Sequence, residues 1–465
     1  MDAEPRDALI HKLQAENAAL RGEAEALRAE AEALRAEVQA LRELVKQLTD
    51  RVEQLQREAH RQAAPFRRKD KAKKPPDQHK RPGRPTGHPP AFRPPPEQSD
   101  EDIEMRLDQC PNCGGPITAV QRCEQYIEDI PLMRPHVTHL TTYVGTCRCC
   151  GEVRSTHPLQ VSTASGAAGT HLGARALALA AWLNKRLGMT TRSVCKLLEG
   201  LFDLKLTPGG LTQALDRVAD KAQPAFDQLV TELRCQSGVW ADETSWWVGE
   251  PGWWLWTFTS PDLTVYHVDR SRGRDVVLDM LGEDFGGVLT SDCLASYENL
   301  PYKMHKCYSH HLKAIAQAYE DVPSDYLVQL RALLKAAIFL QAHRADLPPP
   351  EFAWKQRHLE ERADELLLRT TPPTGAAKVA ARIGKRRRWL FTFLDDPSLE
   401  ATNNRAERAL RPAVIARKLS CGNKTPRGKH TWEILTSLAA TCQQRGQDFV
   451  EFLRPRLALM ATPVR

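Results

Sequence analysis

The sequence predicts a multidomain α+β protein with an N-terminal coiled coil, a zinc ribbon, a helical segment and an α/β core that carries a helical insertion. Three observations lead to this prediction: a leucine at every seventh position near the N-terminus, two cysteine pairs at metal-binding spacing, and a series of short apolar strands after residue 236. With 465 residues the chain is long enough for several domains, and a hydrophobic content of 42% excludes a wholly disordered protein.

The formal net charge is +7, and the positive excess is concentrated in two blocks. Residues 61–95 contain eleven Lys or Arg and two Asp, and residues 403–430 contain eight Lys or Arg and one Glu. Two separate basic blocks indicate a polyanionic partner, although a solvated surface explains either block alone. The sequence contains no run of about 18 apolar residues, so no membrane span is expected. The acidic N-terminus lacks the apolar stretch of a secretion signal.

Residues 1–60 are predicted to form a parallel coiled coil. Leucines recur every seven residues without interruption, and apolar residues stand three positions before most of them. These are the d and a positions of a heptad repeat, and such a row of leucines needs a partner helix, which argues against a single surface helix. Asn17 at an a position would fix the register. We therefore expect a homodimer with d positions at Leu13, Leu20, Leu27, Leu34, Leu41, Leu48 and Leu55.

Residues 61–100 are predicted to be a basic, proline-rich linker without a packed core, because proline removes backbone donors and favours an extended chain. The segment Arg81-Pro-Gly-Arg84 can lie in a narrow A·T minor groove, where the potential is most negative. The alternative is a tether that touches phosphates without selecting a sequence, and the composition slightly favours it. Both alternatives make Arg81 and Arg84 candidate DNA contacts.

Residues 101–160 are predicted to form a zinc ribbon. Twelve cysteines in a chain of this length do not suggest a disulfide scaffold, but four of them form two Cys-x-x-Cys pairs that are each followed by glycine. Four thiolates give a closed tetrahedral Zn²⁺ site that is structural rather than catalytic. A hairpin over residues 126–143 could fill the gap between the pairs. The predicted ligands are Cys110, Cys113, Cys147 and Cys150, with Cys149 as an alternative, His136 and His139 as weaker candidates, and Cys123 outside the site.

Residues 161–235 are predicted to be helical, in the segments 172–186, 191–202 and 208–233. Thr190 and Thr207 stand where helix N-caps are expected. Short helices joined by tight turns are typical of a helix-turn-helix that enters the DNA major groove, and a plain helical connector fits the same pattern.

Residues 236–430 are predicted to contain an α/β core. The expected order is three strands, a helix and two further strands, at 238–248, 253–259, 263–268, 274–282, 287–292 and 303–307. This order resembles an RNase H-like core, in which acids on the first strand and at the end of the fourth lie side by side. The tryptophans of the first two strands are predicted to pack within the sheet.

Three acids in this core are candidate metal ligands: Asp242 on the first strand, Asp292 at the end of the fourth, and Glu407 on a later helix. Carboxylates are ligands that Mg²⁺ prefers, and three of them can hold two ions that activate one oxygen and stabilise another as it leaves. The long separation between Asp292 and Glu407 predicts a helical insertion at about 323–395. Residues 431–465 are predicted to be a C-terminal helical segment.

Each acid also has a structural alternative. Glu243 could be the ligand in place of Asp242, since strand alternation sends these two side chains to opposite faces and only one can serve. Asp292 could cap the next helix. Glu407, three residues after Asn404, could close a capping box.

The chain resembles the insertion-sequence-66 family of bacterial DDE transposases. The resemblance covers nearly the whole chain, because the coil, the Gly-Arg-Pro-x-Gly-His linker and the Cys-Pro-x-Cys-Gly pair occur in the family's order. The motifs that carry it are Ala241-Asp-Glu-Thr244, Leu289-Thr-Ser-Asp292 followed by Ala295-Ser-Tyr297, Cys307-Tyr-Ser-His310, and most firmly Asn403-Asn-Arg-Ala-Glu-Arg-Ala-Leu-Arg-Pro412 followed by Arg417-Lys418.

This resemblance implies a transposase that cleaves transposon ends and joins the freed 3′-hydroxyls to target DNA, with Asp242, Asp292 and Glu407 holding two Mg²⁺ or Mn²⁺ ions. The implied partners are double-stranded DNA and accessory proteins at the nucleoid in the bacterial cytoplasm, with no membrane. The alternative is a non-catalytic, dimeric DNA-binding protein.

The basic residues near Glu407 are candidate contacts for DNA phosphates under the same resemblance. Cys307 and His310 are interpreted as packing rather than as part of a metal site. The candidate phosphate contacts are Arg405, Arg408, Arg411, Arg417 and Lys418, and in the insertion Lys385-Arg-Arg-Arg388.

Overall fold

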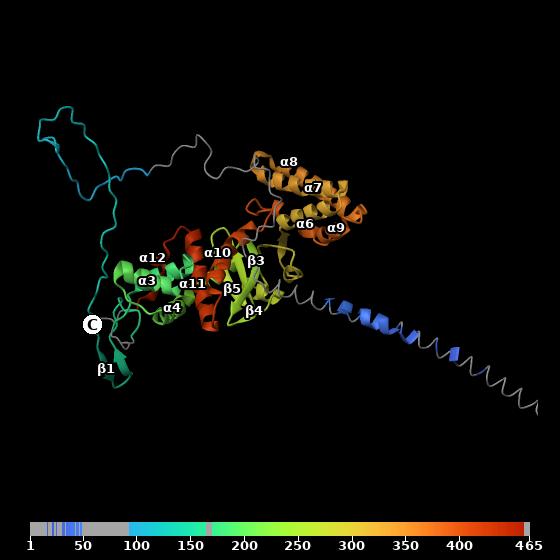
Figure 1. Ribbon diagram of the computed structural model, residues 1–465, viewed down its shortest axis with the longest axis horizontal. Coiled ribbons are helices and arrows are strands. Elements are labelled where there is room, and N and C mark those ends of the chain that lie inside the picture. The colour runs from blue at the N-terminus through green and yellow to red at the C-terminus, as the bar shows by residue number, and fades with distance from the viewer. Residues whose placement is uncertain are drawn as a thin grey trace, which may run out of the picture. The chain divides into compact units, whose positions relative to one another are not determined.

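The computed structural model describes residues 93–163 and 170–459, together with residues 16, 21–22, 25, 30–32, 34–41, 43–45 and 47–48 (Figure 1). The chain divides into two compact units, Met1–Glu128 and Asp129–Arg465. Over the described residues, no helix combines the length and the apolar character needed to cross a bilayer.

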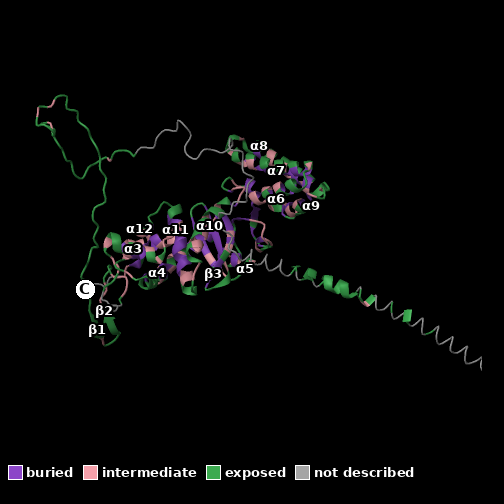
Figure 2. Cartoon of the chain, in the orientation of Figure 1, coloured by how far each residue is buried: buried purple, intermediate pink, exposed green. Residues whose placement is uncertain are grey.

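In the first unit, the described residues between 16 and 48 are helical and almost all exposed (Figure 2). The heptad positions Leu34, Leu41 and Leu48 are 54%, 54% and 57% exposed, so their side chains are bare on the single helix. The other predicted d positions lie outside the described residues, as do Arg81 and Arg84 of the linker. The coiled-coil homodimer therefore stays a prediction, and the exposed leucines are consistent with it.

A two-stranded hairpin, β1 (Val144–Cys147) with β2 (Gly151–Arg154), begins the regular structure of the second unit. The longer hairpin predicted over residues 126–143 is wrong, because this stretch contains no strand. Pro131 and Pro135 interrupt it, and a proline cannot donate a hydrogen bond to a strand ladder.

The three predicted helices of the next segment are confirmed. They are α2 (Ala174–Ala181), which continues into the π-helical turn η2 (Trp182–Arg186), then α3 (Thr191–Phe202) and α4 (Pro208–Arg234). The hydroxyls of Thr190 and Thr207 accept hydrogen bonds from the amides of Ser193 and Gly210. Both threonines are thus the N-caps that the sequence predicts, and they satisfy amides that have no partner within the helix.

A five-stranded mixed sheet follows, and all five predicted strands are present. The strands are β3 (Gly238–Val248), β4 (Glu250–Thr259), β5 (Thr264–Asp269), β6 (Val288–Ser291) and β7 (Lys303–Lys306). They lie in the order β5-β4-β3-β6-β7. Neighbours are antiparallel from β5 to β3 and parallel from β3 to β7. The predicted helix α5 (Arg274–Leu281) connects β5 with β6.

The predicted helical insertion is confirmed between β7 and the later helices. It encloses a hydrophobic core of its own, which includes Leu327, Leu334 and Phe393 and reaches the sheet at Trp240 and Val288. Its helices are α6 (Tyr308–Asp321), α7 (Asp325–Ala342), α8 (Pro349–Asp364) and α9 (Ala377–Gly384), with the short turns η4 (Arg344–Asp346), η5 (Glu365–Arg369), η6 (Arg387–Trp389) and η7 (Thr392–Leu394).

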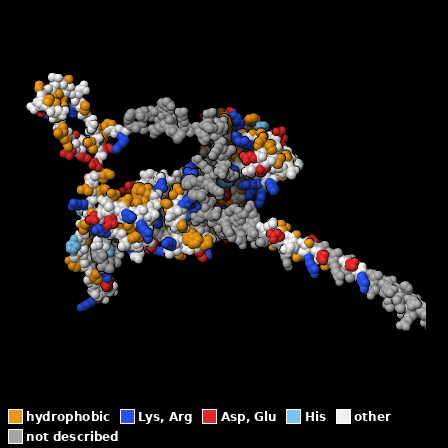
Figure 3. Space-filling view, in the orientation of Figure 1, with side chains coloured by type: hydrophobic (Ala, Val, Ile, Leu, Met, Phe, Trp, Pro, Cys, Tyr) orange, Lys and Arg blue, Asp and Glu red, His pale blue; other side chains and the backbone are white. Residues whose placement is uncertain are grey.

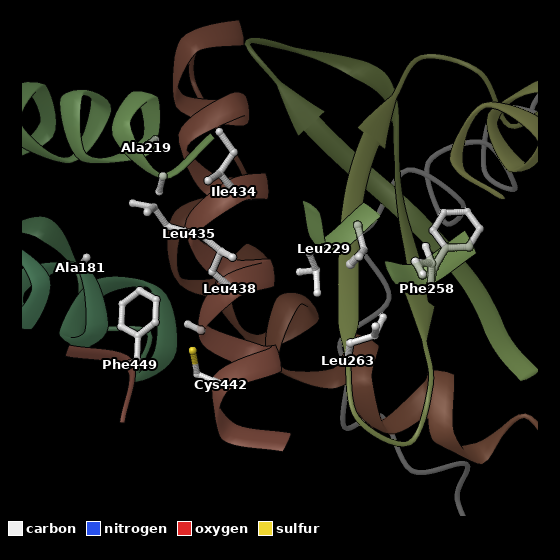
Figure 4. Close-up of a cluster of buried hydrophobic side chains, with 14 of the residues drawn as sticks. Ala181, Ala219, Leu229, Phe258, Leu263, Ile434, Leu435, Leu438, Cys442 and Phe449 are labelled. Atoms are coloured by element: carbon white, nitrogen blue, oxygen red, sulfur yellow. The ribbon is translucent and has the colours of Figure 1, made fainter. Parts of the chain in front are cut away.

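Three helices close the described chain: α10 (Asn404–Ser420), α11 (Pro426–Gln444) and α12 (Phe449–Leu457). Side chains of α11, α12, α2, α4 and the sheet form one continuous hydrophobic core. Figure 4 shows Leu435 and Leu438 of α11 in this core, with Ala219 of α4 and Phe258 and Leu263 from the sheet region. Segments before and after the sheet in sequence are therefore packed together.

Helix α11 also satisfies the outer edge of the sheet at β5. The amides of Thr264, Tyr266 and Val268 donate to side-chain oxygens of Thr441, Ser437 and Glu433. In a strand the amides of every second residue point the same way, and in a helix the side chains of every fourth residue lie on one face. The three strand amides can therefore each meet one side chain of the helix. Backbone groups that would otherwise be an open sheet edge are thereby paired.

We predict that Ser437→Ala lowers the free energy of unfolding by about 1–3 kcal/mol, because the amide of Tyr266 would stay buried without a partner. The Ser437 hydroxyl accepts from that amide at 2.9 Å and donates to the Glu433 carbonyl at 2.6 Å. Urea unfolding followed by tryptophan fluorescence measures the change. Ser420→Ala, at an exposed position of α10, is the control, and equal midpoints for both variants would contradict the prediction.

Candidate active site

The three predicted acids come from three neighbouring elements. Asp242 lies in β3, Asp292 directly follows β6, and Glu407 is in the first turn of α10. β3 and β6 are parallel neighbours with Trp240 opposite Thr290, so Asp242 and Asp292 follow at the same end of the two strands. Helix α10 packs against β3 and β4.

The charges of these acids affect one another. Burial, together with the negative charges of Glu243, Asp292 and Glu407, raises the pKa of Asp242 to about 7. In the described part of the chain, however, no three His, Cys, Asp or Glu side chains are grouped closely enough to hold a metal ion. The structure thus brings the three acids into one neighbourhood without grouping them as a set of ligands.

Glu243, the alternative to Asp242 as a ligand, is engaged in contacts inside the protein. Its side chain is 2% exposed, and its carboxylate accepts hydrogen bonds from Arg272 at 2.8 Å and from the Tyr297 hydroxyl at 2.7 Å. Arg272 in turn lies over the ring of Trp254. Glu243 is therefore committed to an internal ion pair on the face opposite Asp242.

The structural alternatives for the other two acids are answered in different ways. Asp292 Oδ1 accepts from the amide of Leu294 at 2.9 Å, so this carboxylate does stabilise the loop that follows it. Glu407 closes no capping box, because helix α10 begins one residue earlier than that motif requires, with Asn403 as its N-cap. Glu407 is exposed at the surface of α10.

The three predicted acids differ from the acids around them in their ion pairs. Glu243 pairs with Arg272, Glu298 with Lys385 and Arg386, and Glu400 with Arg405. Within the described ranges, Asp242, Asp292 and Glu407 form no ion pair with a basic side chain. Nearby acids with a structural role are thus neutralised by the protein, whereas the three predicted ligands have no basic partner among the described residues.

Asn403, a residue with no role predicted from the sequence, attaches helix α10 to β3. It is fully buried, its side-chain amide donates to the carbonyl of Ala241 at 2.8 Å, and its backbone amide donates to Cys307 Sγ at 3.1 Å. Ala241 directly precedes Asp242, and Asn403 is one helical turn before Glu407. The polar residue at the start of the motif helix is the signal that could have revealed this contact.

Cys307 and His310 form a hydrogen-bonded pair at the start of α6. Cys307 is fully buried, which raises the pKa of its thiol, but the hydrogen bonds with His310 and with the amide of Asn403, together with the charge of His310, outweigh burial and lower that pKa overall. The same bond raises the pKa of His310, to which the charges of Asp292 and Glu407 also contribute. The imidazole of His310 therefore lies within range of the candidate site, in addition to any packing role.

Two of the five predicted phosphate contacts are engaged inside the protein. Arg405 pairs with Glu400 at 2.6 Å and lies over the Trp240 ring, and Arg417 donates to Thr244 and Ser245. Arg408 and Arg411 are exposed on α10, and Lys418 is half-buried. Basic side chains on the visible face are interspersed with acidic and apolar ones (Figure 3). Arg408 and Arg411 are thus the best placed of the five to meet a phosphate.

The basic run in the insertion is occupied by internal contacts. Lys385 and Arg386 bind Glu298, Arg387 binds Asp364, and Arg388 lies over the Trp389 ring. The predicted packing of the strand tryptophans holds for Trp246, which contacts Trp432, and for the fully buried Trp256.

Each cysteine pair forms a tight turn that suits thiolates. Backbone amides of Asn112 and Cys113 lower the pKa of Cys110, and those of Cys149 and Cys150 lower the pKa of Cys147. The first turn is closed by the amide of Gly114, which donates to the carbonyl of Cys110 at 2.8 Å. Amides directed at a sulfur favour its charged form, which is the form that binds Zn²⁺. The single four-thiolate site stays a prediction.

The donor set around Asp242 fits a hard divalent cation. All three candidate ligands are carboxylates, which Mg²⁺ and Mn²⁺ prefer. The mutual repulsion that raises the pKa of Asp242 would be relieved by a bound cation.

We predict that Asp242→Asn stabilises the protein more at pH 8 than at pH 5, by about 2–3 kcal/mol. The folded state keeps the Asp242 proton up to a pKa of about 7, whereas the unfolded chain releases it near the ordinary aspartate pKa of 3.8. Wild-type stability therefore falls as pH rises through this window, and the asparagine variant lacks that loss. Urea unfolding at several pH values measures it.

The control for this comparison is Asp275→Asn, which removes an exposed carboxylate from α5. A stability difference between Asp242→Asn and wild type that stayed constant from pH 5 to pH 8 would contradict the clustering of carboxylates around Asp242.

Comparison with known proteins places this site in a family. Residues 169–431 match the transposase IS66 family, a span that contains all three acids. Over 289 residues the chain is 24% identical to the uncharacterized protein y4qI of Sinorhizobium fredii (strain NBRC 101917 / NGR234), covering 54% of this chain and 53% of that protein. Over 82 residues it is 32% identical to the uncharacterized protein y4jO of the same strain, covering 18% of this chain and 26% of that protein.

The chain thus spans about half of the first relative and about a quarter of the second. With more than half of its length matched, the chain belongs to the IS66 family of transposases.

Proposed function

We propose that this chain is a DDE-type DNA transposase that cleaves transposon ends and joins them to target DNA. The observation that carries the proposal is the shared neighbourhood of Asp242, Asp292 and Glu407, three acids without a basic partner in the described structure. They lie within the span that matches a transposase family.

An RNase H-like arrangement of the core is part of this proposal. Its support is the antiparallel trio β5-β4-β3 joined to the parallel strands β6 and β7, with one acid on the central strand β3 and one after β6. The helical insertion then separates these strands from α10, which supplies the third acid.

In the proposed reaction, the three carboxylates would hold Mg²⁺ or Mn²⁺. When bound, two such ions supply Lewis-acid activation of the attacking oxygen and stabilisation of the leaving oxygen of a phosphodiester. Asp242 and Asp292 are held by adjacent strands, and Glu407 is held by the helix that Asn403 attaches to β3. Arg408 and Arg411 on the same helix as Glu407 would bind backbone phosphates and orient the strand to be cut.

The remaining segments would bind and pair DNA ends. We propose a coiled coil at 1–60 for homodimerisation, a linker at 61–100 whose Arg81 and Arg84 contact DNA, and a zinc ribbon at 101–160. The helices within 161–235 would add DNA contacts as a helix-turn-helix or serve as a connector, and accessory proteins are further candidate partners.

A second candidate is a non-catalytic, dimeric DNA-binding protein of the same family. The observation that favours it is the absence, among the described residues, of three acids grouped at metal-binding distance. The two candidates differ in DNA cleavage and not in DNA binding.

We predict that the wild-type protein with Mg²⁺ cuts a labelled duplex that carries the end of its own insertion element, and that Asp292→Asn reduces cutting at least about a hundredfold. The reason is the loss of one of three carboxylates that hold the ions. Gel analysis of products measures cutting, and a mobility-shift assay measures binding of the same duplex.

Asp275→Asn is the matched control, since it removes an exposed carboxylate that is not one of the three predicted ligands and should cut like wild type. Equal cutting by wild type and Asp292→Asn would remove the enzymatic assignment at this site. Binding without cutting by the wild type would favour the non-catalytic candidate.

We predict that the purified chain holds about one Zn²⁺ ion and that Cys110→Ser lowers this content substantially, since one of four thiolate ligands is lost. Metal analysis after exhaustive dialysis measures it. Cys123→Ser is the control, because Cys123 lies outside the two pairs and should leave the zinc content unchanged. Unchanged zinc in Cys110→Ser would refute the ribbon.

A further inference from the structure

The loop that follows Asp292 is held from the β7 side by a buried lysine. Lys306 is fully buried, and its ammonium donates to Ser291 Oγ at 2.9 Å and to the carbonyl of Tyr297 at 3.3 Å. These contacts bracket Asp292, because Ser291 precedes it and Tyr297 ends the short turn η3 (Ala295–Tyr297) after it. The Lys306 ammonium also lies 5.5 Å from the centre of the Trp389 ring, which belongs to the insertion.

The same loop is held from the insertion by an arginine. Arg386 is 8% exposed, and its guanidinium donates to the carbonyl of Cys293 at 3.2 Å and pairs with the carboxylate of Glu298. A further bond from Arg386 to the carbonyl of Arg382, at 2.9 Å, ties the side chain to helix α9. Arg386 thus connects the helical insertion with both ends of the loop that begins at Cys293.

Charge neutralisation makes this connection stable. Burial raises the pKa of Glu298, but the hydrogen bond to Lys385 and the charges of Arg386 and Lys385 outweigh it, and the pKa is lowered overall. Glu298 therefore remains an anion that pairs with the guanidinium. Removing the arginine would leave a mostly buried carboxylate short of a partner and a carbonyl without its donor, and both changes favour rearrangement of the loop.

The loop geometry transmits such a rearrangement to Asp292. The Cys293 carbonyl that Arg386 binds belongs to the residue next to Asp292, and the amide of Leu294 on the same peptide unit donates to Asp292 Oδ1 at 2.9 Å. A shift of that peptide plane moves the donor that fixes the carboxylate. The contact at Cys293 is therefore one hydrogen bond removed from the candidate metal ligand.

We propose that Arg386 is a positioning residue for Asp292, through which the helical insertion sets the orientation of this carboxylate. The proposal rests on the proposed function, because Asp292 needs a fixed orientation only if it binds metal. It also gives the insertion a role in the site: a movement of α9 relative to the sheet, for instance on DNA binding, would alter the position of Asp292.

The test compares full-length wild type with Arg386→Ala, Arg386→Lys and Glu298→Gln. Two measurements are made without DNA: Mn²⁺ binding by electron paramagnetic resonance of free Mn²⁺, and hydrogen–deuterium exchange of residues 292–298 in metal-free protein. Arg386→Ala should weaken Mn²⁺ binding about tenfold or more, which is typical of losing a partner behind a metal ligand, and should speed exchange in the loop. Arg386→Lys should recover part of both, because it retains the charge.

Arg344→Ala is the matched control for a purely structural loss. Arg344 also donates to a backbone carbonyl in the insertion, that of Leu394 at 2.6 Å, and lies over the ring of Phe352, but it does not contact the loop after Asp292. This variant should lower thermal stability while leaving Mn²⁺ binding and loop exchange as in wild type. If Arg386→Ala does not fold, Glu298→Gln tests the same contact.

The outcomes separate the two proposals. Wild-type Mn²⁺ affinity and loop exchange in Arg386→Ala, or equal losses in Arg344→Ala, would overturn the positioning role and leave the transposase proposal intact. Absence of both Mn²⁺ binding and DNA cleavage in the wild type would overturn the transposase proposal. In that case the exchange rates alone decide whether Arg386 orders the loop.

Discussion

The placement of several carboxylates in one partly buried neighbourhood is the constraint on which the candidate site depends. Burial and the like charges near Asp242 disfavour its ionised form and together raise its pKa to about 7. The surrounding structure neutralises only some of these acids. Arg272 pairs with Glu243 and Arg386 with Glu298, whereas the described structure gives Asp242, Asp292 and Glu407 no cationic side chain. The ion pairs thus assign Glu243 and Glu298 to stabilising the fold, and the role of the other three acids as cation ligands stays a proposal.

Much of the fold could be predicted from local patterns, because strands, caps and helices depend on residues close in sequence. The five strands, the capping threonines Thr190 and Thr207 and the helical insertion are all confirmed. The hairpin over residues 126–143 is wrong for an equally local reason, the two prolines within it. The pairing of α11 with β5 was not predictable in this way, since it joins residues about 170 positions apart through side-chain oxygens.

The acids of the candidate site could be predicted from the sequence, but the side chains that contact and position the surrounding residues could not. Strand alternation shows that Asp242 and Glu243 point to opposite faces, but it does not show which face carries an arginine. That choice depends on Arg272 and Tyr297, which reach Glu243 from other elements. Likewise, the basic residues Arg405 and Arg417 resemble phosphate contacts in sequence, and only their partners Glu400 and Ser245 show that they are engaged inside the protein.

Each of the three acids is fixed by a different buried polar contact, and these contacts come from separate parts of the chain. Next to Asp242 in strand β3, Glu243 forms an ion pair that holds the strand in place. The loop of Asp292 is held by Lys306 and Arg386. The helix of Glu407 is attached to β3 by Asn403. Such contacts form only when the sheet, the insertion and α10 are packed together. Because each acid is held by a different element, the spacing of the three carboxylates depends on how the sheet, the insertion and α10 are packed together.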